Sequence, residues 1–410
     1  MTSMTEQRAK IGLQALELEF GAAAVKAATE AVKKFKVEIP SWIFGPFGGG
    51  RFGEYLPPGA ARSIQEKLDD AAVVNRLTGA TEFVAMHVLW DFTEDGSLGS
   101  YTIAREVHEM AGERGLKIGS VSPTYFLRGS HRNSYAADEK STCDHYIEQT
   151  VFAGRIAKDF GVRLITLWFP DGSNYPGQID LQRNYETMKK NLLATRQMIA
   201  DDVWILLEYK VFEPGTYSTT IPDWGTAFAL TRAMGGNTGV LVDLGHHFHS
   251  ANIEQIVARL VSEGMRCGFH FNTRYAADDD HSVEPTPEMA RIFYELVSGK
   301  VIANRDENKN WAYMIDQCSG RENRLHAIIH SVDMLQNCLA KAMLIDRQAL
   351  QDLQAKDEII LANRLFNDAL IHADVRPIVA TARLEQLLPI DPMAAFIESG
   401  YQRKIEKERI

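Results

Sequence analysis

The chain has 410 residues, with 44 Lys and Arg against 54 Asp and Glu, and a formal net charge of −10 at pH 7. This acidic balance argues against a nucleic-acid partner, because nonspecific binding to nucleic acid depends on clustered cations. No apolar run approaches the ~20 residues that span a bilayer, and the N-terminus combines early charges with no apolar core of a secretory signal, so we expect no membrane partner.

The four cysteines are Cys143, Cys267, Cys318 and Cys338. They are far apart in the sequence and form no CxxC spacing, which is the usual signature of zinc or redox chemistry. Four free thiols fit a reducing compartment, and we therefore expect a cytoplasmic protein.

Residues 1–36 are predicted to be helical, because Ala, Glu, Lys and Leu dominate and apolar residues recur near helical spacing. Short apolar runs then begin. Most are rich in β-branched or aromatic residues and have the length of strands that are buried on both faces. Eight such runs are present: 37–44, 83–88, 116–121, 164–169, 204–209, 239–244, 266–271 and 313–316.

Helical segments lie between most of these runs, for example 101–114, 144–160, 181–201, 223–234, 253–264 and 287–298. Strand–helix alternation predicts parallel pairing, because parallel neighbours need a crossover connection that is usually helical. With no strong linker between them, we expect the strands to close into a (β/α)8 TIM barrel of the α/β class. A doubly wound open sheet is the competing arrangement.

The strand signals fade after residue 320, and residues 323–372 and 378–388 are predicted to be helical. This is too much helix for one crossover, so we predict a C-terminal helical extension that lies against another subunit or along the side of the barrel. The expected organisation is an N-terminal helical segment over 1–36, a barrel with the metal site over 37–320, and the extension over 321–410, which would make oligomer contacts.

Potential metal ligands end each of the last four predicted strands. These strands finish in WILLEYK, VLVDLGHH, GFHFN and YMIDQ, and an acidic run, AADDD, follows the third of them. The carboxyl ends of barrel strands surround one mouth, so these side chains are expected to converge there. Buried carboxylates need compensating cations. An oxygen-rich set with one or two imidazoles suits Mn²⁺, Mg²⁺ or Co²⁺.

The spacing of these residues predicts two divalent ions per subunit. The first ion would be held by Glu208, Asp243, His270 and Asp316. The second would share Asp243 as a bridge and add His246, Asp278 and Asp280. His246 follows Asp243 across Gly245, where the chain can bend so that both side chains face inward. Asp278 and Asp280 are alternate residues, so their carboxylates point the same way in an extended loop.

Single residues of this set also have ordinary explanations. One acid at a strand end is commonly a helix N-cap or a solvated loop residue, and this is our interpretation of Asp279 and His281. We interpret His247 and His249 as packing or hydrogen-bonding histidines. Four consecutive strands that all end in potential ligands favour a metal site over such explanations.

Aromatic residues near the ends of the first four predicted strands suit a polyol. Trp42, Trp90 and Trp168 are candidate substrate-binding residues, because aromatic faces stack on the C–H patches of sugars. His87, with Asp91 nearby, is a candidate acid–base pair for opening a sugar ring. We therefore expect a monosaccharide as the small-molecule partner.

These features resemble a known group of enzymes. Glu-x-Lys on the fifth strand, Asp-x-x-His on the sixth, His followed by Asp-x-Asp on the seventh and Asp on the eighth resemble the xylose isomerase superfamily. More narrowly, the chain is similar to bacterial L-rhamnose isomerases of relaxed aldose specificity from about residue 37 to the C-terminus. The segments that carry this similarity are PSW, MHVLWD, WFPDGSNYPGQ, LEYKVFEPGTYST, LVDLGHH, NIEQIVARL, GFHFN, DDD and MIDQ.

The resemblance implies roles for individual residues. The first predicted ligand set would hold a structural-type ion and the second a catalytic-type ion. Lys210 would hydrogen-bond the substrate oxygen at C1 or C2, and His87 would assist ring opening. Trp168 would line the sugar, and Phe52 would reach the mouth of a neighbouring subunit. Lys210, His87 and Asp316 are thus the candidate catalytic residues, in a homotetramer that uses Mn²⁺.

The chain departs from the family directly after GFHFN. Relatives continue with Asp-Ser-Lys, whereas this chain has Thr273, Arg274 and Tyr275. The replacements remove an acid and a lysine beside the second predicted ion. The loop length to Asp278 is retained, so we expect the metal ligands to keep their positions. We expect the protein to contact the distal end of the substrate differently.

With the resemblance, the sequence predicts a metal-dependent aldose–ketose isomerase that converts L-rhamnose to L-rhamnulose and accepts other aldoses. Hydrogen would move between C1 and C2 either as a hydride or as a proton through an ene-diol. The alternatives are a ketose 3-epimerase with one ion, a metal-dependent hydrolase of phosphoester or C–N bonds, and a sugar-binding protein without activity.

Overall fold

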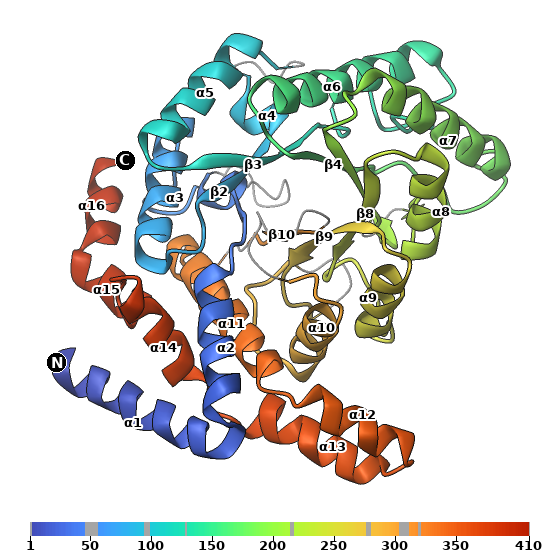
Figure 1. Cartoon of the computed structure of the whole chain (residues 1–410). Coiled ribbons are helices and arrows are strands. Elements are labelled where there is room, and N and C mark those ends of the chain that lie inside the picture. The colour runs from blue at the N-terminus through green and yellow to red at the C-terminus, as the bar shows by residue number, and fades with distance from the viewer. Residues whose placement is uncertain are drawn as a thin grey trace.

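The computed structural model describes residues 2–45, 56–93, 99–127, 129–213, 217–275, 280–302, 311–318 and 321–409. Eight parallel strands in these residues form a barrel that is ringed by helices (Figure 1). Their order is β1 (Ile39–Pro40), β2 (Phe83–His87), β3 (Lys117–Ser122), β4 (Leu164–Trp168), β5 (Trp204–Glu208), β8 (Thr238–Asp243), β9 (Arg266–Phe271) and β10 (Trp311–Ile315). The structure confirms the predicted TIM barrel and not the competing doubly wound open sheet.

The barrel closes between its first and last strands through Glu38. The Glu38 amide donates to the Tyr313 carbonyl and the Ile315 amide donates to the Glu38 carbonyl, each at 2.9 Å. The first strand is shorter than the predicted run 37–44, because Pro40 has no amide hydrogen to continue the ladder. The chain instead turns into the short helix η1 (Ser41–Phe44).

Alternate residues of the strands fill the barrel interior with apolar side chains, and one layer of them lies directly below the mouth. Leu206, Leu241 and Met314 belong to this layer. A Cβ on Gly268 would lie 2.6 Å from Leu206 Cδ1 and 2.9 Å from Leu241 Cδ1, so a larger residue here would displace these leucine side chains. The polar residues of the mouth follow the residues of this layer by two positions on each strand. They therefore lie directly above the apolar layer.

Helices cover the outside of the barrel, and most of them begin at a side-chain cap. The residues before α3 (Ile64–Thr78), α5 (Tyr101–Glu113), α7 (Leu181–Met198), α8 (Trp224–Met234), α9 (Ile253–Ser262) and α10 (Pro287–Ser298) accept a hydrogen bond from a first-turn amide. Two further helices, α6 (Lys140–Asp159) and the single turn α4 (Val88–Asp91), also cover the barrel and have no side-chain cap. The predicted helical segments are found within a few residues of these bounds.

Two further groups of helices come from the ends of the chain. The predicted N-terminal helix is two helices, α1 (Thr2–Phe20) and α2 (Ala22–Lys34), because the chain turns at Gly21 with φ 88°. The C-terminal extension consists of α11 (Arg324–Met343), α12 (Arg347–Ala355), α13 (Ile359–Asn367), the π-helical turn η3 (Asp368–His372), α14 (Arg376–Glu385), α15 (Pro392–Ser399) and α16 (Tyr401–Glu408).

These terminal helices share an apolar core of their own. Val25 and Val32 of α2 pack in one cluster with Leu344 and with Ile378 and Val379 of α14. In Figure 1, α1, α2 and α14 lie together at the side of the barrel. The division of the chain at residues 36 and 320 stays a prediction.

A short antiparallel hairpin, β6 (Phe212–Glu213) and β7 (Tyr217–Ser218), follows β5. The four cysteines form no disulfide. Within the described ranges, no helix combines the length and the apolar character that a bilayer crossing requires.

Candidate metal centre

Four potential ligands meet at the carboxyl ends of the last four barrel strands: Glu208 at the end of β5, Asp243 at the end of β8, His270 in β9 and Asp316 directly after β10. Each offers one ligand atom, and these atoms all lie within 4.8 Å of one another. The strand ends thus bring together every member of the first ligand set that was predicted from the sequence.

His270 is in contact with all three carboxylates of this group. Its Nδ1 lies 3.2 Å from Glu208 Oε1, 3.3 Å from Asp243 Oδ2 and 3.6 Å from Asp316 Oδ2. One ring nitrogen carries at most one proton, so it cannot donate to all three. Asp243 Oδ2 is buried and accepts no hydrogen bond from the described residues, which is costly for a carboxylate unless a cation shares the site.

The pKa values show that the group attracts positive charge. Burial opposes a charge on His270, but the Glu208 and Asp243 carboxylates outweigh it and raise the pKa of the ring well above its usual value. Burial also raises the pKa of Asp316 to about 6. A divalent cation would supply positive charge directly. Three carboxylates and an imidazole therefore fit a hard or borderline divalent ion.

A second group of potential ligands shares Asp243. Asp243, His246 and Asp280 each offer an atom within 4.8 Å of the others. His246 Nδ1 lies 3.2 Å from both the Tyr209 carbonyl oxygen and Glu208 Oε1, and a proton on Nδ1 leaves Nε2 with a lone pair for a cation. Asp278, the remaining predicted ligand of this set, lies outside the described residues.

Asn272 is a residue of the mouth that the sequence analysis missed. Its Nδ2 donates to Asp243 Oδ1 at 2.9 Å and to Asp280 Oδ1 at 3.1 Å. It follows His270 by two residues, and this alternate spacing on one strand end is the signal that could have found it. Asn272 connects the two acids of the second group.

Both groups open into a cavity of about 1080 Å³ at the mouth of the barrel. Its lining includes the predicted residues Trp42, His87, Trp90, Trp168, Glu208, Lys210, His246, His270, Asp280 and Asp316. Phe52, which was predicted to reach a neighbouring subunit, lies outside the described residues. Trp42 also donates from Nε1 to Asp316 Oδ1 at 2.9 Å, so this tryptophan orients a predicted ligand.

His87 belongs to an aromatic wall of this cavity, where its ring stacks on Trp90 with centroids 4.0 Å apart. Burial lowers the pKa of His87 to about 3, so the ring is neutral at neutral pH. The predicted acid–base pair with Asp91 needs correction. Asp91 accepts from the His87 backbone amide at 2.7 Å and from Lys67 Nζ at 2.8 Å, whereas His87 Nδ1 lies 3.3 Å from Thr124 Oγ1.

Lys210 is buried beside the same cavity. Its Nζ donates to Glu213 Oε2 at 3.2 Å and lies 5.0 Å from the centre of the Trp168 ring. A carboxylate and an aromatic face both stabilise an ammonium group. The Lys210 ammonium group thus places a positive charge at the mouth, opposite in sign to the acids of the two ligand groups.

Two of the residues at which the chain departs from the resembling pattern, Thr273 and Arg274, contact residues outside the two ligand groups. Arg274 is buried, donates to the Phe248 carbonyl at 2.8 Å and pairs with Glu288 at 3.0 Å. Thr273 accepts from the Glu284 amide at 2.8 Å through Oγ1. The described contacts of Thr273 and Arg274 are therefore with neighbouring loops and α10.

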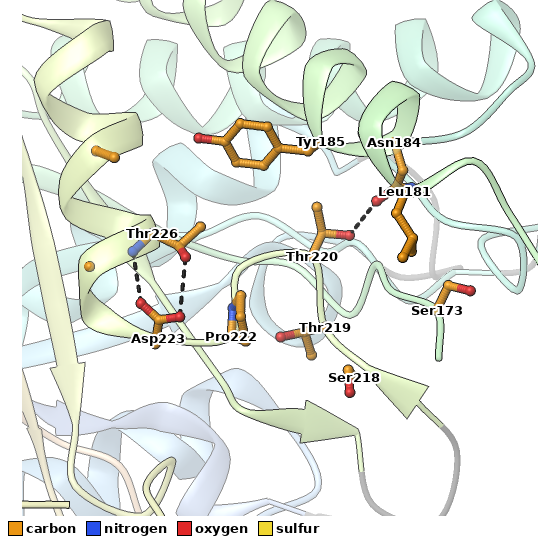
Figure 2. Close-up of a pocket in the computed structure, with 12 residues that line it drawn as sticks. Ser173, Leu181, Asn184, Tyr185, Ser218, Thr219, Thr220, Pro222, Asp223 and Thr226 are labelled. Atoms are coloured by element: carbon orange, nitrogen blue, oxygen red, sulfur yellow. Dashed lines mark hydrogen bonds between the residues drawn. The ribbon is translucent and has the colours of Figure 1, made fainter. Parts of the chain in front are cut away.

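A second cavity, of about 580 Å³, lies where the first turns of α7 and α8 meet the hairpin strand β7 (Figure 2). Its hydroxyl-rich lining is already hydrogen-bonded, since Thr220 Oγ1 donates to Asn184 Oδ1 at 2.8 Å and Asp223 accepts from the Thr226 amide at 2.9 Å. None of its described residues joins a group of potential metal ligands. The chemistry-bearing residues are thus those of the barrel mouth.

Solved structures with this architecture include enzymes that act on sugars. A xylose isomerase domain protein from Alicyclobacillus acidocaldarius superposes with a TM-score of 0.52 at 14% identity, over 75% of this chain and 99% of that one. An L-ribulose 3-epimerase superposes with a TM-score of 0.51 at 12% identity, over 80% and 98%. These likenesses show the fold alone, a TIM barrel.

Sequence comparison identifies the family. The family described as L-rhamnose isomerase (RhaA) matches residues 46–368. The chain is 35% identical to a probable sugar isomerase of Rhizobium meliloti, over 94% of this chain and 88% of that protein. A probable sugar isomerase of Mesorhizobium japonicum is 33% identical over 94% and 89%. The chain belongs to the L-rhamnose isomerase (RhaA) family and is an aldose–ketose isomerase, which confirms the predicted family and enzyme class.

Proposed function

We propose that the protein is a divalent-metal-dependent isomerase that converts L-rhamnose to L-rhamnulose and also accepts other aldoses. The observation that supports the metal requirement is the convergence of three carboxylates and one imidazole within 4.8 Å at the mouth of the barrel. The proposal includes two ions per subunit, held by the two predicted ligand sets. Mn²⁺ is the proposed ion, with Co²⁺ or Mg²⁺ as substitutes.

The residues around the ligand groups have distinct parts in the proposed reaction. Bound divalent ions supply Lewis-acid polarisation of a carbonyl. Lys210 would stabilise the negative charge that develops on the substrate oxygen at C1 or C2. His87 is neutral because burial lowers its pKa to about 3. It would accept the proton of the anomeric hydroxyl while the bond between C1 and the ring oxygen breaks, and it would pass that proton to the ring oxygen. Hydrogen would then move between C1 and C2 as a hydride or a proton.

The aromatic part of the cavity supports a sugar as the substrate. Trp42, Trp90 and Trp168 line it and would present apolar faces to the C–H groups of the open chain. Ser122 and Thr166 lie in the same lining and are hydrogen-bonded to each other at 2.6 Å, so hydroxyl groups also face the cavity. Apolar faces together with hydroxyl partners are what a polyol requires.

Replacing Glu208 by Gln tests the metal requirement. The change keeps the size of the side chain and removes one ligand charge, so conversion of L-rhamnose to L-rhamnulose with added Mn²⁺ should be abolished. The matched control is Glu106→Gln on α5, where the side chain is exposed and should not affect turnover. Turnover of Glu208→Gln above a tenth of the wild-type value would refute the assignment.

A panel of aldoses assayed with the same preparation defines the substrate. We expect L-rhamnose to be the best substrate and other aldoses to be converted more slowly. Counting Mn²⁺ per subunit separates the isomerase from a ketose 3-epimerase, since the proposal requires two ions and the epimerase alternative one. Inversion at C3 of a ketose without aldose formation would favour the epimerase.

We further propose that the protein is a cytoplasmic homotetramer in which Phe52 reaches the mouth of a neighbouring subunit. Family membership supports the tetramer, and the free cysteines support a reducing compartment. Sedimentation equilibrium should give four times the chain mass of 45.9 kDa. Replacing Phe52 by Ala should raise KM for the aldose and leave the Mn²⁺ affinity unchanged.

A further inference from the structure

Asn272 lies between the two acids of the second ligand group. It is 1% exposed and directly follows β9. Its Nδ2 donates to Asp243 Oδ1 at 2.9 Å and to Asp280 Oδ1 at 3.1 Å. Asp243 ends a barrel strand, whereas Asp280 belongs to the segment in which the chain returns to the barrel. The amide therefore joins a strand end to a loop.

The backbone on either side of this loop is fixed without the Asn272 side chain. Thr273 and His281 exchange two backbone hydrogen bonds of 3.1 Å, which close the base of the loop. The Asp280 carbonyl accepts from the Cys318 amide at 3.1 Å, next to the end of β10. Asn272 consequently acts on the direction of the Asp280 carboxylate, because the path of the chain is held by other bonds.

The two oxygens of Asp243 have different partners. Oδ2 faces the first group, 3.3 Å from His270 Nδ1. Oδ1 accepts from the Asn272 side chain and from the Gly245 amide at 2.8 Å. The Asn272 amide thus contacts the Asp243 oxygen that does not face His270, and through Asp280 it contacts a second acid of the second group.

We propose that Asn272 is a positioning residue that sets the affinity of the second cation site and leaves the affinity of the first unchanged. The inference rests on the proposed function, since it requires two ions. An amide donor between two carboxylates offsets their mutual repulsion and holds them at the separation that a shared cation needs. Loss of such an outer partner weakens metal binding roughly 10–100-fold.

The test is a calorimetric titration of metal-free protein with Mn²⁺, comparing wild type with Asn272→Leu. Leucine has the same branched shape, although it is larger, and it removes both hydrogen bonds. The second Mn²⁺ should bind roughly 10–100-fold more weakly, and the first should bind as in wild type. Electron paramagnetic resonance provides a second measurement, because the signal of a coupled Mn²⁺ pair should give way to that of a single ion.

Asn184→Leu is the matched control. Asn184 is also buried, donates to the Ala136 carbonyl at 3.3 Å and accepts from Thr220 at the cavity of Figure 2. This variant loses a buried amide elsewhere, so both Mn²⁺ affinities should stay at their wild-type values. A general loss of stability would show in its thermal melt, whereas the effect of Asn272 should appear in the second affinity.

The possible outcomes separate the inference from the proposed function. If Asn272→Leu does not fold, Asn272→Ser replaces it, because serine remains polar but is too short to reach both acids. An unchanged second affinity in either folded variant, or equal weakening of both ions, overturns the role of Asn272. Wild-type protein that binds no Mn²⁺ overturns the proposed function instead.

Discussion

The two ligand groups at the barrel mouth are built in different ways. Every member of the first group lies on a barrel strand or next to one, and all four of its residues are described in one tight cluster. In the second group, Asp243 lies at a strand end, whereas His246 and Asp280 lie on loops. Asn272 lies between the two acids. Strand ends fix ligand positions through the barrel itself, whereas loop ligands need side-chain supports. The first site should therefore be the tighter and the less sensitive to changes in neighbouring residues.

Asp243→Asn should have the largest effect, because Asp243 is the one residue that the two groups share. Both ions should be lost from the variant. Loss of Lewis-acid stabilisation worth ~4 kcal/mol corresponds to roughly a 1000-fold fall in kcat/KM. The measurements are isomerase kinetics with saturating Mn²⁺ and metal content after dialysis. A variant that keeps one tightly bound ion would contradict the shared ligand.

His246→Ala should separate the two sites. It removes a ligand of the second group only, so one Mn²⁺ should remain bound per subunit with nearly wild-type affinity. We expect kcat to fall roughly 100-fold, which corresponds to ~2.7 kcal/mol. His249→Ala is a control on the same loop, where the imidazole is exposed. Loss of both ions from His246→Ala would break the distinction between the sites.

Trp42→Phe should have a smaller effect, confined to the first site. The change keeps an aromatic face in the cavity but removes the 2.9 Å hydrogen bond to Asp316. We expect the first Mn²⁺ to bind roughly tenfold more weakly, with the second affected less. Trp90→Phe is the control, since it alters another aromatic residue of the cavity lining. Equal changes in the two tryptophan variants would show that the aromatic faces matter more than the hydrogen bond.

His87 differs from the ligand histidines, because its ring contacts aromatic side chains. Its expected effect, on the pH dependence of stability, is the smallest of the four. Its folded pKa of about 3 lies below the usual value of 6.5, so the unfolded chain takes up the proton first as the pH falls. Stability should therefore decrease from about pH 6.5 downwards, by ~1 kcal/mol between pH 7.5 and 5.5.

Urea unfolding of wild type and His87→Phe at pH 7.5 and 5.5 measures this contribution. Phenylalanine cannot titrate, so the variant should lose about 1 kcal/mol less than wild type over this interval. Comparing the two proteins removes the contribution of other groups, among them Asp316, whose raised pKa has the opposite effect on stability. Identical losses in the two proteins would show that His87 is not held neutral.

The barrel and the first ligand group could be predicted because both follow from local patterns. Apolar runs that alternate with helical segments predict a parallel barrel, and a barrel brings its strand ends to one mouth. Polar residues at the ends of four strands, such as Glu208 and Asp316, must then meet. These steps need only sequence periodicity and the geometry of the fold.

The supporting contacts could not be predicted, because they depend on which atoms meet after the barrel has closed. Asp91 illustrates this point. Its spacing from His87 indicated a side-chain pair, but its carboxylate contacts the backbone amide of His87, Ser41 Oγ and Lys67 Nζ. The hydrogen bonds of Trp42 and Asn272 to the acids are of the same kind, since each joins residues from different strands or loops.

The terminal helices have a consequence for synthesis on the ribosome. Lys33 of α2 pairs with Glu385 of α14 at 2.9 Å across 352 positions of the chain, and Asp70 pairs with Arg409 at 2.7 Å. Glu385 is translated 352 positions after Lys33, so α2 is synthesised well before its partners in α14. Until then the apolar face of α2 lacks its partners in α14, and exposed apolar surface of this kind favours aggregation.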